Sequence, residues 1–103
     1  MADESLVRMA ELEIFPARLE EYLTFLTEEI SASVEREPGV HMLHAVADKA
    51  EPHKIRILEV YASRAAYEAH IETPHFLKYK LGTTDMVAGL RLIDMDPIIL
   101  ASR

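Results

Sequence analysis

The sequence predicts an α+β fold, an antiparallel sheet with helices on one face. Segments whose apolar residues alternate with a two-residue period are interleaved with segments whose apolar residues recur every three or four residues. The order of these segments is β-α-β-β-α-β. With 103 residues, half of them hydrophobic (50%), the chain has room for one domain, which we expect to span residues 1–103.

The first strand is predicted at Leu6–Ile14, where only Arg8 interrupts the alternation. One face carries Leu6, Ala10, Leu12 and Ile14, and the other carries Val7, Met9, Glu11 and Glu13. A helix is predicted from Pro16 to the Pro38-Gly39 pair, because proline suits the first turn and Pro-Gly ends a helix. Its predicted apolar face is Leu19, Tyr22, Leu23, Leu26, Ile30 and Val34. Its glutamates are interpreted as a solvated face: Glu20, Glu21, Glu28 and Glu29.

The second half of the chain predicts a hairpin, a kinked pair of helices and a last strand. The hairpin strands are Val40–Ala47 and His53–Ala62, joined by a polar loop that contains Pro52. Ser63 is a predicted N-cap, and Thr73-Pro74 starts a second short helix. The last strand is predicted at Leu90–Met95, followed by an apolar tail, Ile98-Ile99-Leu100.

The order β-α-β-β-α-β is that of a ferredoxin-like fold, with the helices on one face of an antiparallel sheet. The opposite face includes Leu58 and Val60 and is too apolar to be left in water. Two such faces packed together make a two-fold homodimer with a barrel-like interior, a dimeric α+β barrel.

Composition excludes several classes of function. The net charge is −7 and the chain has no cysteine, which argues against nucleic-acid binding, disulfides and thiolate metal sites. The three glycines form no phosphate-binding loop. No apolar stretch is long enough to span a membrane, and the acidic start is unlike a secretory signal, so we expect a cytoplasmic protein.

The candidate site is a cluster of ionisable and aromatic residues between the third predicted strand and the helical pair: Glu59, Tyr61, Tyr67, His70, His75 and Tyr79. Such a concave site suits a small apolar ligand. The structural alternative is that the tyrosines are core residues and His70 a hydrogen-bonded buried histidine. We expect no metal ion, since Thr73-Pro74 interrupts the helix between His70 and His75, and His41 and His44 fall on opposite faces of their strand.

The stretch from Glu59 to Phe76 resembles the signature of the antibiotic biosynthesis monooxygenase family. In that family a strand ends in Glu-x-Trp or Glu-x-Tyr, and an alanine-rich helix follows with a histidine and then Thr-Pro-His-Phe. Pro38-Gly39-Val40 is similar to the family's turn into the second strand. The resemblance implies the dimeric barrel fold and a range of chemistries: cofactor-free oxidation of quinols and anthrones, heme degradation, or isomerisation of a phosphorylated autoinducer-2 product.

Two departures make heme degradation unexpected. Leu12 stands where heme-degrading relatives have an asparagine, and Tyr79-Lys80 occupies the stretch of their iron-binding histidine. Tyr61 in place of the family tryptophan is shared with the autoinducer-2 branch, which keeps the isomerase as an alternative. Because the basic residues that would anchor a phosphate are scattered along the sequence, we favour an uncharged aromatic substrate.

The predicted function is therefore a cofactor-independent monooxygenase acting on a small aromatic quinol with molecular oxygen, without metal, flavin or heme. His70 is the predicted base or charge stabiliser, oriented by Glu59, and His75 is an alternative base or a structural cap. Substrate contacts are predicted from Tyr61, Tyr67, Phe76 and Tyr79. A further alternative is a non-enzymatic dimer that binds a small molecule.

Overall fold

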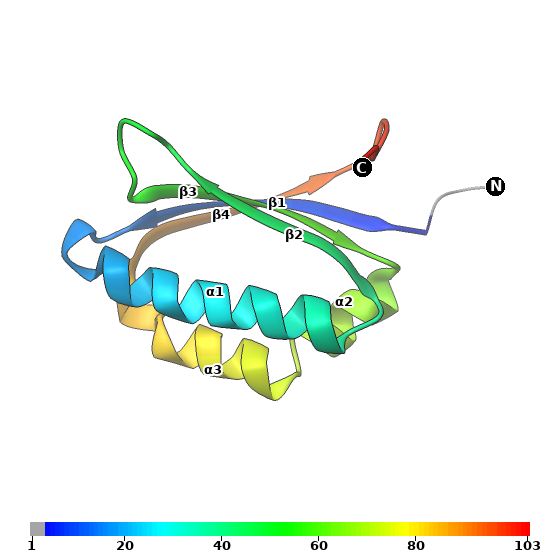
Figure 1. The fold of residues 1–103 in the computed structure, drawn as a ribbon, viewed down its shortest axis with the longest axis horizontal. Coiled ribbons are helices and arrows are strands. Elements are labelled where there is room, and N and C mark those ends of the chain that lie inside the picture. The colour runs from blue at the N-terminus through cyan, green and yellow to red at the C-terminus, as the bar shows by residue number, and fades with distance from the viewer. Residues whose placement is uncertain (1–3) are drawn as a thin grey trace.

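The computed structural model describes residues 4–103 and confirms the α+β, ferredoxin-like prediction (Figure 1). The elements are β1 (Leu6–Ile14), α1 (Leu19–Arg36), β2 (Val40–Ala47), β3 (Lys54–Tyr61), α2 (Arg64–His70), α3 (Pro74–Gly82) and β4 (Val87–Met95), with short 3-10 turns at Pro16–Arg18 and Thr84–Met86. The four strands form one antiparallel sheet in the order β2-β3-β1-β4. No helix within this described part is both long and apolar enough to cross a membrane.

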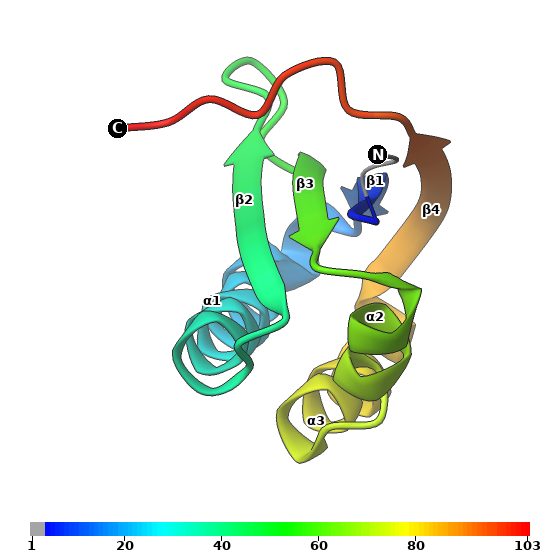
Figure 2. The same cartoon turned by 90° about the vertical axis from the view of Figure 1, so that its right-hand side faces the viewer.

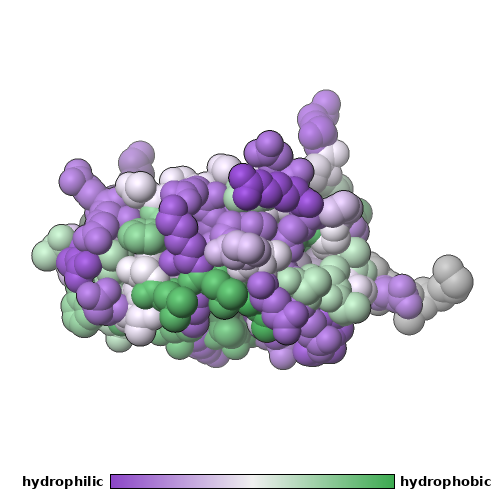
Figure 3. All heavy atoms as spheres, turned by 90° about the horizontal axis from the view of Figure 1, so that it is seen from below, coloured by the Kyte–Doolittle hydropathy of each residue, from purple (hydrophilic) through white to green (hydrophobic). Residues whose placement is uncertain are grey.

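All three helices lie on one side of the sheet, and the C-terminal tail crosses its other side (Figure 2). On that other side the register places Val7 of β1 next to Val60 of β3, and both are buried. Large apolar side chains nevertheless remain exposed on this face and on the tail: Val46, Met95, Ile98, Ile99 and Leu100. The helix side also shows a patch of apolar surface between polar side chains (Figure 3).

The last strand begins earlier than the predicted Leu90. β4 starts at Val87 and pairs with β1 along its whole length, with a register shift opposite Glu13 and Ile14. The sequence Val87-Ala88-Gly89 has no alternating apolar pattern, so this extension is set by pairing with the neighbouring strand and not by local preference.

The predicted helix starts of the helical pair are confirmed. Ser63 accepts a hydrogen bond from the backbone N–H of Ala66, and Thr73 accepts one from that of Phe76. Gly39, at the turn into β2, lies directly against α2, because a Cβ atom placed there would come within 2.6 Å of the Ala66 side chain. These features fix the two ends of α2 and bring it close to the end of α1.

The prediction that Glu29 belongs to a solvated helix face is wrong. The buried residues of α1 are Tyr22, Leu26, Glu29 and Ser33, and Glu29 is only 6% exposed. The predicted core residues Leu23 and Val34 are instead exposed. Positions 22, 26, 29 and 33 are spaced by four, three and four residues and form one helical stripe. The stripe that faces the sheet therefore contains one carboxyl group, which the apolar pattern alone does not reveal.

Beneath the sheet the packing differs along its length. At one end, the packed end, a cluster includes Ile14, Tyr22, Ile55 and Met86. At the other end a smaller cluster contains Val40, Leu43 and Tyr61, with Tyr67 packed against it.

Candidate active site

A cavity of about 410 Å³ opens between the sheet and the helices. Apolar side chains from β1, α1 and β3, such as Leu12, Leu26 and Ile57, form part of its wall. Its lining also contains eight ionisable side chains: Arg8, Glu29, Glu59, Tyr61, Tyr67, His70, Tyr79 and Lys80. A mostly apolar cavity with a few convergent polar groups is the usual form of a small-molecule site.

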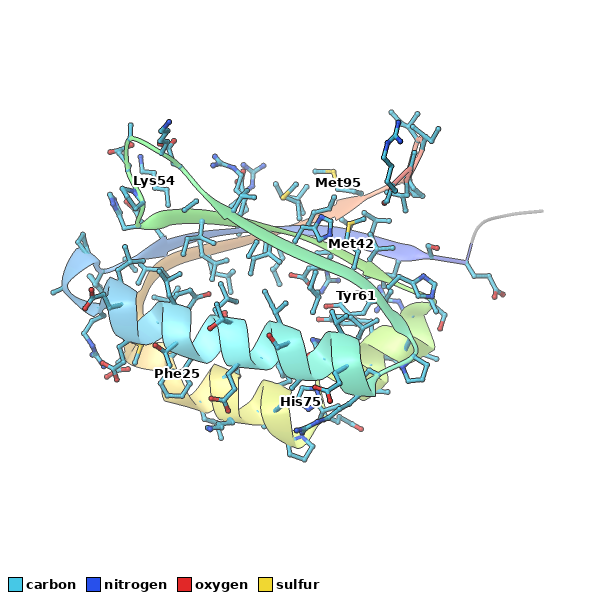
Figure 4. All side chains as sticks on the ribbon, viewed as in Figure 1. Phe25, Met42, Lys54, Tyr61, His75 and Met95 are labelled. Carbon is cyan, nitrogen blue, oxygen red and sulfur yellow. The ribbon has the colours of Figure 1, made fainter. Side chains whose placement is uncertain are left out.

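Most of the sequence-predicted site residues line this cavity: Glu59, Tyr61, Tyr67, His70, Phe76 and Tyr79. His75 is not among the lining residues and lies at the start of α3, whereas Tyr61 points from the sheet toward the helices (Figure 4). The ring of Tyr61 contacts those of Tyr67 and His70, with ring centroids 5.2 and 5.3 Å apart. The helical pair and the third strand therefore meet as the sequence predicts.

Two carboxyl groups contact His70: that of Glu29, which lies in α1, and that of Glu37, the residue that follows α1. The imidazole is 2% exposed, its Nδ1 lies 3.0 Å from Glu37 Oε2 and its Nε2 lies 3.4 Å from Glu29 Oε1. The expectation that Glu59 orients His70 is wrong, because Glu59 Oε1 accepts its hydrogen bond from the Tyr61 hydroxyl at 2.6 Å. His70 ends α2 beside the end of α1 (Figure 1). Its two ring nitrogens therefore reach the carboxyl groups of Glu29 and Glu37, while the face of the ring contacts Tyr61 of β3.

Glu37 binds both histidines through one oxygen atom. His75 Nε2 lies 2.6 Å from the same Oε2 that contacts His70 Nδ1. Burial alone raises the pKa of Glu37, but the hydrogen bonds from His70 and His75 outweigh it and hold that pKa below its ordinary value. An ionised carboxylate only accepts hydrogen bonds, so each histidine donates an N–H to it. A neutral His70 then carries its proton on Nδ1 and keeps a lone pair on Nε2, next to Glu29.

Three of these side chains could also hold a metal ion. The ligand atoms of Glu37, His70 and His75 all lie within 4.8 Å of one another. The Thr73-Pro74 break removes the i, i+4 helical spacing of the two histidines, as predicted, but it turns α3 so that both rings reach Glu37. Two imidazoles and one carboxylate suit Zn²⁺ or Fe²⁺. In this structure the two rings hydrogen bond to the carboxylate oxygen.

Glu29 is a site residue that the sequence reasoning missed. It lines the cavity, accepts a 2.8 Å hydrogen bond from Ser33 Oγ through Oε1, and has a pKa raised by burial. The signal was available, because Glu29 is three residues from Leu26 and seven from Tyr22 on the apolar side of the helix. A carboxyl group at such a position is costly unless it is paired or neutral.

Glu59, Tyr61 and Arg8 form the polar part of the cavity next to the sheet. Burial raises the pKa of Glu59 despite the hydrogen bond from Tyr61, and burial likewise raises the pKa of Tyr61. The guanidinium of Arg8 lies 4.5 Å from the centre of the Tyr67 ring and binds Asp94 at 3.1 Å. The hydroxyl of Tyr79, which also lines the cavity, lies 2.6 Å from that of Tyr22. The cavity lining therefore offers two cations, two carboxyls, several hydroxyls and one imidazole.

Comparisons with known proteins agree with this fold. The family model described as antibiotic biosynthesis monooxygenase matches residues 5–80. A crystal structure from Bacteroides thetaiotaomicron, of a protein provisionally named as an antibiotic biosynthesis monooxygenase, is 51% identical, has a TM-score of 0.95, and is matched over 100% of this chain and 98% of that chain. A similarly named protein of Nitrosomonas europaea has a TM-score of 0.87 over 95% of this chain and 94% of that chain. At 19% identity this second likeness shows the fold alone.

An uncharacterized protein of Synechocystis is 28% identical over 87 residues, which are 84% of this chain. The chain spans 58% of the length of that curated relative. The family model covers about three quarters of the chain, and the Bacteroides protein matches it from end to end. This chain therefore belongs to the antibiotic biosynthesis monooxygenase family, as the stretch from Glu59 to Phe76 indicates.

Proposed function

We propose that the protein is a cofactor-independent monooxygenase that oxidises a small aromatic quinol or anthrone with molecular oxygen. Membership of the family supports a monooxygenase-type function. The observation that carries the proposal is the Glu37–His70 pair, in which a carboxylate orients a buried imidazole that lines the cavity and whose second nitrogen lies 3.4 Å from Glu29 Oε1. A histidine fixed in this way is the usual form of a general base.

The reaction requires a base, a dry pocket and a partner for negative charge. For an anthrone, R₂CH₂ + O₂ gives R₂C=O + H₂O, so that the carbon loses four electrons and the oxygen molecule gains them. His70 Nε2 removes the first proton, and the resulting electron-rich anion reacts with O₂ to form a carbon-bound peroxide anion. The protonated His70 returns that proton to the peroxide, which gives a hydroperoxide and a neutral His70. Loss of a second proton from that carbon breaks the O–O bond and leaves the ketone and water.

The other cavity residues have distinct roles in this proposal. Arg8 is placed to stabilise the negative charge of the anion and the peroxide. Tyr61, Tyr67, Phe76 and Tyr79 bound the space for the aromatic rings. Glu59 accepts a hydrogen bond from the Tyr61 hydroxyl and so fixes the orientation of that ring.

His75 acts as a positioning residue in this proposal. It touches Glu37 and does not line the cavity, which favours a role through Glu37 over the alternative of a second base. Replacing His75 with asparagine would then lower turnover by a smaller factor than replacing His70.

Oxygen uptake with a panel of quinols and anthrones tests the proposal. The wild-type protein is expected to consume oxygen. Glu37→Gln is expected to consume oxygen at least about tenfold more slowly, because a neutral amide no longer favours the form of His70 that carries its proton on Nδ1. Glu35→Gln, an exposed change two residues earlier, in the last turn of α1, is the matched control. Saturable binding without oxygen uptake would support the non-enzymatic binder instead, and conversion of a phosphorylated sugar-like substrate would support the isomerase.

The absence of a cofactor is tested separately. Elemental analysis and an absorption spectrum of the active protein are expected to show no stoichiometric metal, flavin or heme. Stoichiometric zinc or iron that is lost in His75→Gln would instead identify Glu37, His70 and His75 as a metal centre and would contradict the cofactor-free mechanism.

We also propose that the protein works as a homodimer. The exposed apolar residues on the outer face of the sheet and on the tail would be covered by a second copy. Sedimentation equilibrium is expected to give twice the chain mass at micromolar concentration. A stable monomer would contradict the barrel arrangement.

A further inference from the structure

Glu29 has an unusual position for a carboxyl group. It lies on the helix stripe that faces the sheet, and its side chain is 7% exposed. Its Oε1 atom accepts a hydrogen bond from the Ser33 hydroxyl and lies 3.4 Å from His70 Nε2. Among the described residues no hydrogen bond involves Oε2 and no fully enclosed side-chain oxygen lacks a partner, so Oε2 keeps some exposed surface. Glu29 is also one of the residues that line the cavity.

The groups around Glu29 favour a neutral acid. On its own helix Glu29 interacts with Ser33 and Tyr22, and Glu37 follows that helix. From the other elements it faces His70 of α2, Glu59 and Tyr61 of β3, and His75 and Tyr79 of α3. The two histidines act against burial and lower the pKa of Glu29. None of these is a permanent cation, and the negative charge of Glu59 opposes a second one nearby. Burial without a cation stabilises the protonated form of a carboxyl group, and the pKa of Glu29 is raised for this reason.

We propose that Glu29 is the proton donor of the cavity, the acid that acts together with His70 as the base. The inference rests on the proposed function and adds to it the residue that delivers a proton to a substrate oxygen. The ligand class that fits such a donor has an oxygen with a free lone pair, such as a carbonyl, a phenolate or a peroxide.

In the proposed reaction the proton is needed when the O–O bond breaks. His70 removes the second proton from the peroxide-bearing carbon, the C–H electron pair forms the C=O bond, and the O–O pair leaves with the distal oxygen. Glu29 gives that oxygen its proton, so the leaving group is water and not hydroxide. The proton on His70 then returns to Glu29 across the 3.4 Å contact between Nε2 and Oε1, which restores both groups.

The first test measures the proton itself and needs no turnover. Infrared difference spectra of the wild-type protein at pH 7 are expected to show the C=O stretch of a protonated carboxyl, and Glu29→Gln is expected to remove it. Glu28→Gln is the matched control, since Glu28 is adjacent in sequence, exposed and forms an ion pair with Lys78. Glu59, whose pKa is also raised, is distinguished by recording the same spectra for Glu59→Gln. If the wild type shows no such band, or if Glu29→Gln removes no part of it, the inference is overturned.

The second test uses anthrone and oxygen. Glu29→Gln keeps an acceptor for Ser33 and is expected to consume oxygen but to form anthraquinone about 10²- to 10⁴-fold more slowly, with the organic hydroperoxide accumulating. Glu29→Asp, which keeps an acid, is expected to restore part of the anthraquinone formation. Unchanged anthraquinone formation in Glu29→Gln overturns the inference.

The two failures are distinguishable. If wild-type protein consumes no oxygen with any quinol or anthrone, the proposed oxygenase function fails, and the infrared band alone decides whether Glu29 carries the proton. A circular dichroism spectrum and a melting curve for each variant separate loss of the acid from loss of the fold.

Discussion

The two ends of the space beneath the sheet are built from different kinds of residue. At the packed end, Ile14, Tyr22 and Met86 fill the volume between β1, α1 and the last 3-10 turn. At the other end, which we call the polar end, Glu29, Glu37, His70 and His75 lie together next to the cavity. The packed end gains free energy from buried apolar surface. The polar end buries ionisable groups, which is costly unless they are paired.

The difference indicates a division between stability and chemistry. Side chains at the packed end could be exchanged for others of similar size with little effect on reactivity. At the polar end each hydrogen bond fixes a proton or a ring orientation, and a change of one atom alters the chemistry. The following substitutions test this contrast, in order of expected effect.

His70→Ala is the largest expected effect at the polar end. Turnover of a quinol is expected to fall about 10²- to 10⁴-fold, because the base is lost. The sequence-based expectation that the fold is retained still applies, although Glu29 and Glu37 lose a shared partner and the melting temperature is expected to fall. Near-normal turnover with a lower melting temperature would show that His70 is structural, and His75→Ala would be the next variant to measure.

Ile14→Ala is the matching change at the packed end. Ile14 is fully buried, and the cavity left by its truncation is expected to lower the free energy of unfolding by about 2–5 kcal/mol. Denaturant unfolding measures this loss. The rate of oxygen uptake at a temperature where the variant is folded should stay close to wild type. A large fall in rate for the folded variant would remove the proposed division between the two ends.

Tyr61→Phe is expected to have a smaller effect than either change. It removes the hydroxyl that donates to Glu59 but keeps the aromatic ring. Loss of a hydrogen bond to a carboxyl group costs about 1–3 kcal/mol of stability, and turnover should fall less than in His70→Ala. If Tyr61→Phe abolished turnover in a folded protein, the hydroxyl would have a direct chemical role.

The smallest effect is a pH dependence at Glu59. Because its pKa is raised in the folded protein, its contribution to stability is full below the ordinary carboxyl range and is lost as the pH rises through the raised pKa. The melting temperature of the wild type relative to Glu59→Gln should therefore decrease as the pH rises above the ordinary carboxyl range. A difference that stays constant with pH would show that Glu59 titrates as an ordinary surface group.

The fold could be predicted from sequence because its signals are local. Alternation in β1, the period of α1 and the caps Ser63 and Thr73 each act within a few residues. The start of β4 could not be predicted in this way, since Val87 to Gly89 become a strand only by pairing with β1.

The sequence predicted which residues of the site lie close together, but not which of them form hydrogen bonds with one another. Tyr61, Tyr67 and His70 lie on elements whose order brings them together. The partner of His70 depends on how α2 sits beside the end of α1, which joins residues 33 positions apart in sequence. Glu37 was missed for this reason. Glu29 was missed because, as a glutamate, it was assigned to the solvated face of the helix, although its position places it on the buried stripe.

The close packing of Gly39 against Ala66 has a consequence for how variants of this protein would behave in an activity screen. Any side chain at position 39 would push α2 away from the turn that carries Glu37, two residues earlier, and would move His70 relative to the carboxylate that orients it. A screen of random mutants would therefore find inactivating changes at a residue that lies outside the cavity lining and has no functional group. Such a mutation would look like a loss of catalysis while being a loss of spacing between two helices.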